Sequence, residues 1–410
     1  MRILLSNNFF YPNMLGGAEK SVETLGRELV ARGHEVHVLC HSGTAETQRF
    51  EHEGMAVTAL GRTLSGTGPT AEARSSIGRL HWHLSAAADR GWTERLRTEI
   101  AAISPDIVNT FNLAGVTTRI WHAVRALDLP LVHTLFGTYL VCFRGPMFRG
   151  GADCGTQCRD CQLLTARRRG DSALVDAVMG DSRAVLGRHL DSGYFGGVPQ
   201  QGVINCGFAG GAALSPDDAD APRPPGPLKI GFMGRLHPTK GLNVLLDACE
   251  KLAGTDGWEL QIAGSGSPEQ EARLTALGEK DNRVRFLGWQ DTRTFLSGID
   301  ISVVPSIWND PLPRVVFESF CAGLPVIGSR IGGIPEMIEP GTTGDLVEPG
   351  DAAALAGVLK TYIANPDRAR AMRGACLSKA GHFTSARFAE DYLTLYSALL
   401  PARGSGRSAG

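Results

Sequence analysis

Residues 2–40 read RILLSNNFFYPNMLGGAEKSVETLGRELVARGHEVHVLC. The apolar run 2–6 predicts a strand, and apolar residues at helical spacing predict a helix over 18–32. Gly33 supplies a helix stop, and residues 35–40 alternate as a second strand. A strand, a helix and a second strand in this order form the building block of a parallel, doubly wound sheet. The fold class is therefore α/β.

The same alternation of strands and helices continues along the chain. Further short apolar runs predict strands at 107–110, 131–135, 228–233, 260–263, 284–287, 301–304 and 325–328. A long helical pattern covers 76–103, and a closing helix is expected over 386–400. Strands that alternate with helices in this way favour parallel sheets.

The length of the chain predicts two domains. A chain of 410 residues is too long for one ordinary hydrophobic core, so we expect two domains of roughly 200 residues each. A polar stretch with several prolines at 215–227 interrupts the pattern and predicts a linker. We expect Rossmann-like domains over 1–214 and 228–385, with the helix 386–400 packing back toward the first domain and a disordered tail at 401–410. Two such domains place a cleft between them, where ligands bind at the carboxyl ends of the strands.

Charge and hydropathy restrict the classes of function. The chain has 41 basic and 42 acidic side chains, so no strong overall field attracts nucleic acid. No hydrophobic run reaches the ~18 residues of a membrane span, and the start of the chain has no signal-peptide pattern. We therefore expect a cytoplasmic protein whose nine cysteines are mostly reduced. The arginines at 167–169 predict solvated charge first, and an acceptor or peripheral membrane contact second.

The strongest chemical signal is a pair of carboxylates eight positions apart, Asp310 and Glu318. Between them, Pro313 suits the first turn of a helix that continues through Val315 and stops at Gly323. The N-terminus of such a helix carries free N–H groups and binds anions. Asp310, on the loop before the helix, is placed to accept hydrogen bonds from sugar hydroxyls, and Glu318 from a ribose.

This region resembles the donor-site signature of glycosyltransferase family 4. The matching segments are 304–306, 310–318, 322–327 and 332–336. The family usually has Glu at both ends of the eight-residue step, whereas this chain has Asp310 at the first, which keeps the charge and loses reach. The resemblance implies the GT-B fold, a retaining transfer of a sugar from a nucleotide diphosphate, and donor contacts at Pro313, Val315 and Glu318. The alternative is an ordinary helix with solvated carboxylates, which leaves the match of the whole spacing unexplained.

A second signal is the segment 234–241, which follows a predicted strand and opens with Gly234. Its two cations, Arg235 and Lys240, suit a diphosphate leaving group, because fixed cations stabilise the charge that grows as the glycosidic bond breaks. The family resemblance assigns them this role, and the alternative is a solvated basic loop. Cationic side chains would make a divalent metal unnecessary, and the family generally works without one, so we expect no required cofactor.

Glycines mark two further donor-binding loops. Gly16 and Gly17 open the first helix, where paired glycines let a ligand approach the backbone, although alone they are equally typical of a turn. Gly264 begins a partial dinucleotide fingerprint, but Glu269 stands at the third glycine, so binding of NAD is excluded. The family resemblance instead places Gly264 near the nucleotide and the strand that contains Phe286 near the base.

A histidine is expected at the sugar. His133 lies near the end of a predicted strand that faces the predicted cleft. Many family members carry a histidine that contacts the donor sugar, either at the position of His133 or at that of Phe136, and we assign the role to His133. The alternative is a core histidine with a satisfied hydrogen bond. The predicted catalytic residues are thus His133, Arg235, Lys240 and Asp310.

Four cysteines gather in one segment, at Cys142, Cys154, Cys158 and Cys161. They admit two interpretations: a structural zinc site with four thiolate ligands, or a loop of unpaired or oxidised thiols. Similar Cys-bearing loops occur in a bacterial branch of family 4.

The resemblance implies a hexosyltransferase that uses a UDP- or GDP-sugar, with UDP favoured, and a saccharide or lipid-linked acceptor in polysaccharide biosynthesis. No catalytic nucleophile is recognisable, so we expect front-face attack in which the leaving diphosphate accepts the acceptor's proton. The alternatives are a nucleotide-sugar-binding sensor, and a phosphorylase or epimerase with the same fold.

Overall fold

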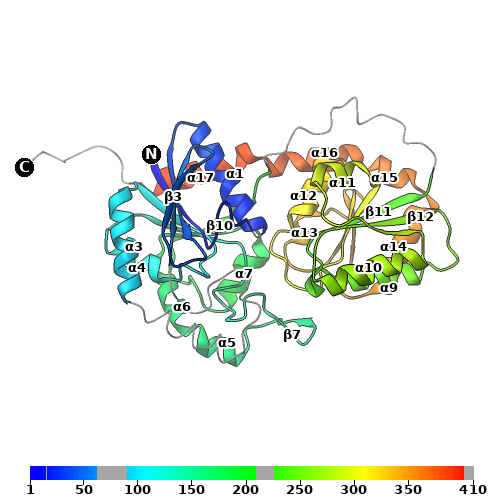
Figure 1. The fold of residues 1–410 in the computed structure, drawn as a ribbon, viewed down its shortest axis with the longest axis horizontal. Helices are drawn as coiled ribbons and strands as arrows, with labels where there is room; N and C mark the ends of the chain where they lie inside the picture. Colours follow the sequence, from blue (N-terminus) through cyan, green and yellow to red (C-terminus); the bar gives the residue numbers. More distant parts are fainter. Residues whose placement is uncertain (15, 62–89, 209–225, 401–410) are drawn as a thin grey trace, which may run out of the picture.

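The computed structural model describes residues 1–14, 16–61, 90–208 and 226–400. Two α/β lobes lie side by side, one built from the N-terminal half of the chain and the other from the C-terminal half (Figure 1). The predicted linker at 215–227 lies almost wholly outside the described residues, as do residues 76–89 of the predicted long helix and the predicted tail at 401–410.

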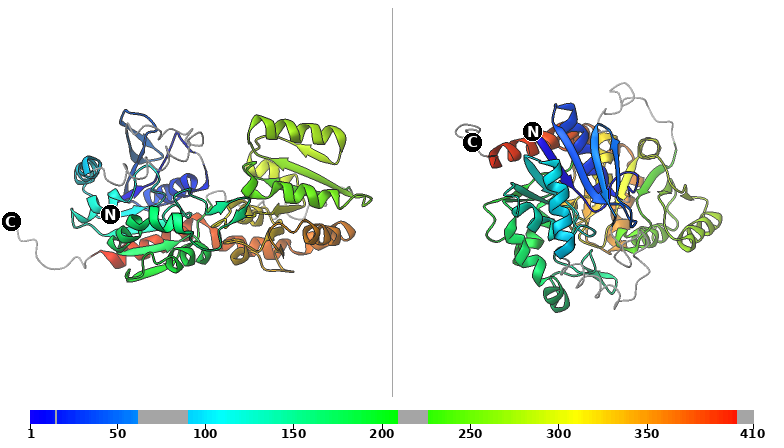
Figure 2. Two further views of the ribbon diagram at one scale, coloured as in Figure 1. Left: turned by 90° about the horizontal axis from the view of Figure 1, so that it is seen from below. Right: turned by 60° about the vertical axis from the view of Figure 1, so that its left-hand side comes forward.

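The N-terminal lobe contains an eight-stranded sheet in the order β10-β9-β6-β5-β1-β2-β4-β3. Its strands are β1 (Arg2–Ser6), β2 (Glu35–His41), β3 (Gln48–His52), β4 (Met55–Leu60), β5 (Ile107–Thr110), β6 (Leu131–Leu135), β9 (Ala177–Gly180) and β10 (Gln200–Val203). All the ladders are parallel except that of β3 with β4. Because helices cover both faces of the sheet, its central strands are buried on both sides (Figure 2).

The helices of this lobe are α1 (Gly17–Ala31), α3 (Arg90–Ile103), α4 (Arg119–Arg125), α5 (Arg159–Leu164), α6 (Ala166–Asp171) and α7 (Arg183–Asp191). The short strands β7 (Phe148–Arg149) and β8 (Ala152–Asp153) form a separate antiparallel pair on the segment that carries the four cysteines.

The C-terminal lobe contains a fully parallel six-stranded sheet in the order β13-β12-β11-β14-β15-β16. The strands are β11 (Leu228–Met233), β12 (Trp258–Ala263), β13 (Val284–Phe286), β14 (Ile301–Val304), β15 (Val326–Ser329) and β16 (Gly344–Val347). The helices are α9 (Leu242–Glu250), α10 (Pro268–Lys280), α11 (Thr292–Ser297), α12 (Arg314–Cys321), α13 (Ile334–Met337), α14 (Ala352–Ala364), α15 (Asp367–Ala371) and α16 (Arg373–Ala380).

The last helix, α17 (Ser385–Leu399), returns to the N-terminal lobe and lies beside α1 (Figure 1). Two of its tyrosines are hydrogen-bonded inside that lobe. Asn109 donates from Nδ2 to the hydroxyl of Tyr396 at 2.7 Å, and the hydroxyl of Tyr392 lies 2.8 Å from that of Thr134. Buried hydrogen bonds of this kind fix the position of the helix on the lobe.

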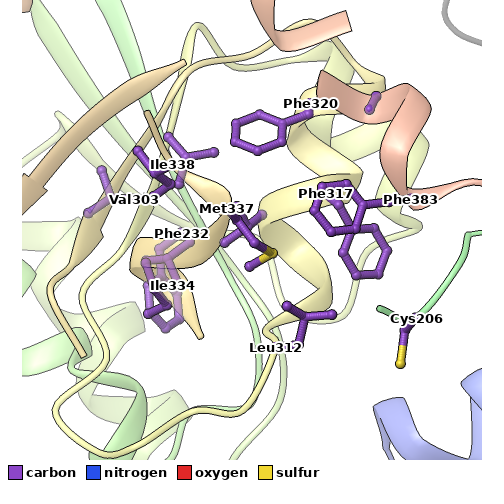
Figure 3. Close-up of a cluster of buried hydrophobic side chains, with 14 of the residues drawn as sticks. Cys206, Phe232, Val303, Leu312, Phe317, Phe320, Ile334, Met337, Ile338 and Phe383 are labelled. Atoms are coloured by element: carbon purple, nitrogen blue, oxygen red, sulfur yellow. The ribbon is translucent and has the colours of Figure 1, made fainter. Parts of the chain in front are cut away.

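Apolar packing holds α12 in the core of the C-terminal lobe. Phe317 of α12 stacks on Phe383, just before α17, with ring centroids 5.4 Å apart (Figure 3). Phe320 and Leu312 are buried in the same cluster. The loop that leads into α12 is therefore anchored by a helix whose apolar side chains are buried in the core.

The structure confirms the predicted α/β class, two doubly wound sheets and the bounds of β1, β5, β6, β11 and β14. The strands β3, β4, β9, β10 and β16 were not predicted. Within the part of the chain that the structure describes, no helix is long and apolar enough to cross a membrane.

Candidate active site

A cavity of about 650 Å³ opens between the two lobes. From the N-terminal lobe it is lined by the start of α1, by Phe136 after β6, by Asp181 after β9, and by Cys206. From the C-terminal lobe it is lined by the segments that follow β11, β12 and β14 and by the first half of α12. The cavity therefore lies at the carboxyl ends of parallel strands, where open α/β sheets bind ligands.

On the N-terminal side, the glycines at the start of α1 allow a cation of the other lobe to approach. Gly16 is the extended N-cap of α1. A Cβ atom added at Gly17 would lie 3.0 Å from Cδ of Arg314. The Arg314 guanidinium donates from Nη1 to Oγ of Ser21 at 3.4 Å. The first turn of α1 thus lies directly opposite the first residue of α12.

On the C-terminal side, two glycine turns pack against each other. Gly234 and Gly264 have φ angles of 157° and 143°, and a Cβ at Gly264 would lie 1.8 Å from the carbonyl oxygen of Gly234. Arg235 and Lys240 follow the first turn and line the cavity. Gly241 has a φ of 70°, and a Cβ there would lie 1.7 Å from the carbonyl oxygen of Pro305. Only glycine permits this contact between the loop and the end of β14.

Lys240 is not an isolated cation. Its ammonium group is ion-paired with Oδ2 of Asp310, and lies 5.6 Å from the centroid of the Trp308 ring. The hydroxyl of Ser306 donates to the same carboxylate oxygen at 3.3 Å. Asp310 is only 5% exposed. The two motifs that the sequence singled out separately are therefore joined at one point of the cavity.

The helix that follows Asp310 has the predicted limits, since Pro313 is its N-cap and Gly323, with a φ of 70°, follows its end. Glu318 lies one turn inside and is ion-paired with Arg314, with 3.3 Å between Nη2 and Oε1. Val315 also lines the cavity.

The backbone before the helix is held by two further glycines. A Cβ at Gly332 would lie 2.1 Å from the carbonyl oxygen of Asp310, and one at Gly333 would lie 1.8 Å from that of Pro311. The N–H of Gly333 donates to the carbonyl of Asp310 at 2.9 Å.

Most of the predicted residues meet in this cavity: Gly16, Gly17, Gly234, Arg235, Lys240, Gly264, Asp310, Pro313, Val315 and Glu318 all line it.

The prediction that His133 faces the cleft is wrong. Its ring does not line the cavity but is buried in the core of the N-terminal lobe, where Nδ1 lies 2.9 Å from Oγ1 of Thr110. The ring meets Trp121 edge-on and stacks on Phe195, with centroids 5.0 Å and 5.9 Å away. Burial lowers the pKa of His133 to about 3, so the ring is neutral. Phe136, the alternative position for the histidine, lines the cavity instead.

Phe286 also lies outside the cavity lining. It ends β13 and packs against the core of the lobe. Beyond Gly288, which has a φ of 65°, the chain turns and brings Trp289 and Gln290 to the cavity. The indole of Trp289 is 75% exposed, which leaves an aromatic face open at the rim.

Sequence reasoning missed other lining residues, among them Asp181, Trp289, Trp308 and Arg314. Arg314 was visible as a cation between the two carboxylates of the donor signature. The indole Nε1 of Trp308 is buried without a partner among the described residues. Such a group is available to a ligand that enters the cavity.

The cysteine segment reaches the edge of the site. The Sγ atoms of Cys142 and Cys161 are 3.8 Å apart, and all four thiols are free. Among the residues that the structure describes, no group of three or more His, Cys, Asp or Glu side chains is arranged to hold a metal ion. The zinc interpretation of this segment stays a prediction.

Asp153, at the end of the hairpin in the same segment, accepts from the N–H of Asn309 at 3.2 Å and is ion-paired with Arg188 at 2.6 Å. The hairpin is thereby attached to the residue that precedes Asp310.

Known proteins share both halves of this arrangement. Residues 15–153 match the pattern described as Glycosyltransferase Family 4, and residues 227–365 match that described as Glycosyl transferases group 1. The chain belongs to glycosyltransferase family 4. The predicted GT-B fold and the predicted class of enzyme, a glycosyltransferase, are confirmed.

Individual proteins resemble all or part of this glycosyltransferase. A 42.6 kDa protein of the cps region of Klebsiella pneumoniae is 28% identical over 82% of this chain and 87% of its own. The lipopolysaccharide core biosynthesis glycosyltransferase LpsE of Rhizobium meliloti is 32% identical over 45% of this chain and 54% of its own. The structure of HepE from Anabaena in complex with UDP has a TM-score of 0.71 at 18% identity, covering 97% of this chain and 100% of HepE.

Proposed function

We propose that this glycosyltransferase moves a hexosyl group from a UDP-sugar to a saccharide or lipid-linked acceptor, with retention of configuration. The observation that carries the proposal is a set of cations that line one cavity beside the N-terminus of α12. They are Arg235, Lys240 and Arg314 of the C-terminal lobe and Lys20 of α1. Cations and a helix N-terminus together suit a diphosphate.

The proposed reaction follows from the placement of these groups. The bond between the sugar C1 and the diphosphate oxygen breaks, and the acceptor oxygen forms a bond to C1 on the same face. The proton of the acceptor hydroxyl passes to the departing phosphate oxygen. Arg235 and Lys240 would stabilise the charge that develops on the diphosphate, which lowers the barrier because they are fixed before the reaction begins.

The pairing of Lys240 with Asp310 suggests how the site changes when the donor binds. A bound diphosphate would share the ammonium with the carboxylate, and Asp310 would then accept from a sugar hydroxyl. Glu318 would accept from the ribose, as the family resemblance implies, and the open face of Trp289 is available for a nucleobase. The use of UDP is supported by HepE, whose structure contains UDP. We propose that no divalent metal is needed, because side chains supply the positive charge.

The proposed acceptor and the proposed biosynthetic context are inferred from the relatives. LpsE acts in lipopolysaccharide core biosynthesis, and the Klebsiella relative lies in a cps region, which favours assembly of a surface polysaccharide.

A peripheral contact with the inner face of the membrane is consistent with Leu163, which is 78% exposed between the exposed Arg159 and Arg167. The neighbouring Arg168 is buried against Tyr139, so the arginine run is only partly solvated.

Two assays test the proposal: sugar transfer to an acceptor, and hydrolysis of the donor without an acceptor. Both are measured as the release of UDP from UDP-glucose, UDP-galactose and UDP-GlcNAc. Lys240→Ala should lower turnover about 100-fold and leave acceptor binding nearly unchanged. Lys251→Ala, an exposed lysine after α9, is the matched control and should have no effect. Equal losses of turnover and acceptor binding in Lys240→Ala would contradict the mechanism. Binding of a nucleotide sugar without any turnover would favour a sensor instead.

A further inference from the structure

Asp181 is a buried acidic residue in the cavity that the proposed reaction does not use. It follows β9 in the N-terminal lobe, lines the cavity and is 4% exposed. The hydroxyl of Ser182 donates to its Oδ1 at 3.3 Å. Among the residues that the structure describes, Asp181 has no cation within ion-pair distance. A buried carboxyl group without a counter-charge requires an explanation.

The position of Asp181 is fixed by contacts between the lobes. A Cβ at Gly333 would lie 3.0 Å from Cβ of the neighbouring Ser182. Glu336 of α13 accepts from the backbone N–H groups of Arg183 and Ala184, both at 2.8 Å. α7 and α13 accordingly lie at the junction of the two lobes (Figure 1).

These contacts bring two carboxyl groups to one cavity from opposite lobes. Gly333, which touches Ser182, also donates its N–H to the carbonyl of Asp310. The end of β9 and the loop before α12 therefore form one packed unit, with Asp181 on one side and Asp310 on the other.

The two carboxyl groups differ in their electrostatic surroundings. Asp310 has the ammonium of Lys240 beside it. Burial, followed by the negative charges of Asp310 and Glu336, raises the pKa of Asp181 well above its usual range. The other titratable groups near it are Cys206 and Tyr392, whose pKa values burial also raises. None of these groups supplies a positive charge, so the surroundings of Asp181 favour its protonated, uncharged form.

A neutral carboxyl group donates one hydrogen bond and accepts others. A sugar hydroxyl does the same, so the two are complementary. A phosphate would instead need a cation, and among the described residues none lies within ion-pair distance of Asp181. The ligand chemistry that fits this side of the cavity is therefore an uncharged, hydroxyl-bearing ring.

We propose that Asp181 binds a hydroxyl group of the transferred sugar and holds the ring against Asp310. The sugar is then bound by residues of both lobes. This inference rests on the proposed function, and it adds a sugar-binding residue on the N-terminal side of the cleft. Phe136, which lines the same side, has no polar atom to offer a hydroxyl.

Binding without an acceptor tests the proposal. Calorimetric titrations compare UDP with UDP-glucose, UDP-galactose and UDP-GlcNAc in the wild type, Asp181→Ala and Asp181→Asn. In Asp181→Ala we expect the affinity for the preferred UDP-sugar to fall about tenfold and the affinity for UDP to stay within about twofold. Asp181→Asn, whose amide both donates and accepts, should recover most of the loss.

The outcomes separate the two proposals. If the wild type prefers a UDP-sugar over UDP and Asp181→Ala keeps that preference, the role of Asp181 is overturned while the proposed function stands. A change confined to the acceptor KM would also overturn it, because Asp181 would then bind the acceptor. If the wild type binds neither UDP nor any UDP-sugar, the proposed function fails and this inference fails with it.

Discussion

Lys240 and Asp310, 70 positions apart in the sequence, form an ion pair in the cavity between the lobes. Asp310 is nearly inaccessible, whereas the side chain of Lys240 is 28% exposed. A carboxylate buried in this way depends on its cation for stability. The same lysine is the one proposed to contact the diphosphate. Lys240 therefore contributes both to the stability of the fold and to the proposed catalysis.

Removing the cation should therefore cost stability as well as turnover. Lys240→Ala leaves the buried carboxylate of Asp310 without its partner and should lower the free energy of unfolding by about 1–3 kcal/mol, after allowance for the exposure of Lys240. Adding Asp310→Asn to Lys240→Ala removes the uncompensated charge and should restore most of that loss, with turnover still low. Urea unfolding of both variants measures this. Equal instability of the single and the double variant would show that the ion pair is not what holds Asp310.

The contact of Glu336 with α7 should control how the lobes close. Glu336→Gln loses one of two hydrogen bonds to backbone N–H groups and the charge at the start of α7. We expect the KM for the donor to rise about 3–10-fold, in line with the loss of one charge-assisted hydrogen bond, and the radius of gyration of the free protein to increase. Glu339→Gln, which removes the same charge from an exposed pair with Lys379, is the control. Identical scattering curves and kinetics for the two variants would contradict a role of Glu336 in closure.

His133 should matter for stability and not for turnover. His133→Ala removes a buried ring that contacts Thr110, Trp121 and Phe195, and should lower the free energy of unfolding by about 2–4 kcal/mol. The kcat and the KM for the donor should stay within about twofold, because the ring does not line the cavity. A large fall in kcat at a temperature where the variant is fully folded would contradict this prediction. It would show that His133 contributes to catalysis although its ring does not line the cavity.

Two buried histidines should make stability depend on pH. Burial lowers the pKa of His133 to about 3 and that of His189 to about 4, from 6.5. The unfolded chain therefore binds more protons between pH 6.5 and 4, and stability falls as the pH decreases through this window. Each histidine contributes about 1.4 kcal/mol per pH unit. Urea unfolding at pH 7, 6 and 5 should give a shallower pH dependence for His133→Gln than for the wild type, and equal slopes would refute the neutral, buried state.

Much of the architecture was predictable because many strands of the two sheets are short, apolar and bounded by clear turns. The run 301–304 and the run 228–233 became β14 and β11 without change. That Asp310, Pro313 and Glu318 lie close together was also predictable, because they belong to one continuous loop and helix.

The side of the sheet that a residue faces was less accessible to sequence reasoning. All five residues of β6 are buried, so no alternation of polar and apolar residues showed which way His133 points. Asp181 was missed for a different reason. Asp181 lines a cavity that both lobes form, and its neighbour Ser182 contacts Gly333 of the other lobe; no local pattern encodes the placement of two domains.

Donor binding is the most direct test of the central claim that the cavity between the lobes holds a nucleotide sugar. Thermal unfolding of the protein should be followed with UDP, GDP and ADP and with their glucose, galactose, mannose and GlcNAc conjugates, with and without EDTA. A ligand at ~100 times its dissociation constant adds roughly 2.7 kcal/mol of stability, which raises the unfolding temperature clearly. We predict a rise with UDP and a larger one with one UDP-sugar, both insensitive to EDTA. No rise with any nucleotide or nucleotide sugar would contradict the account.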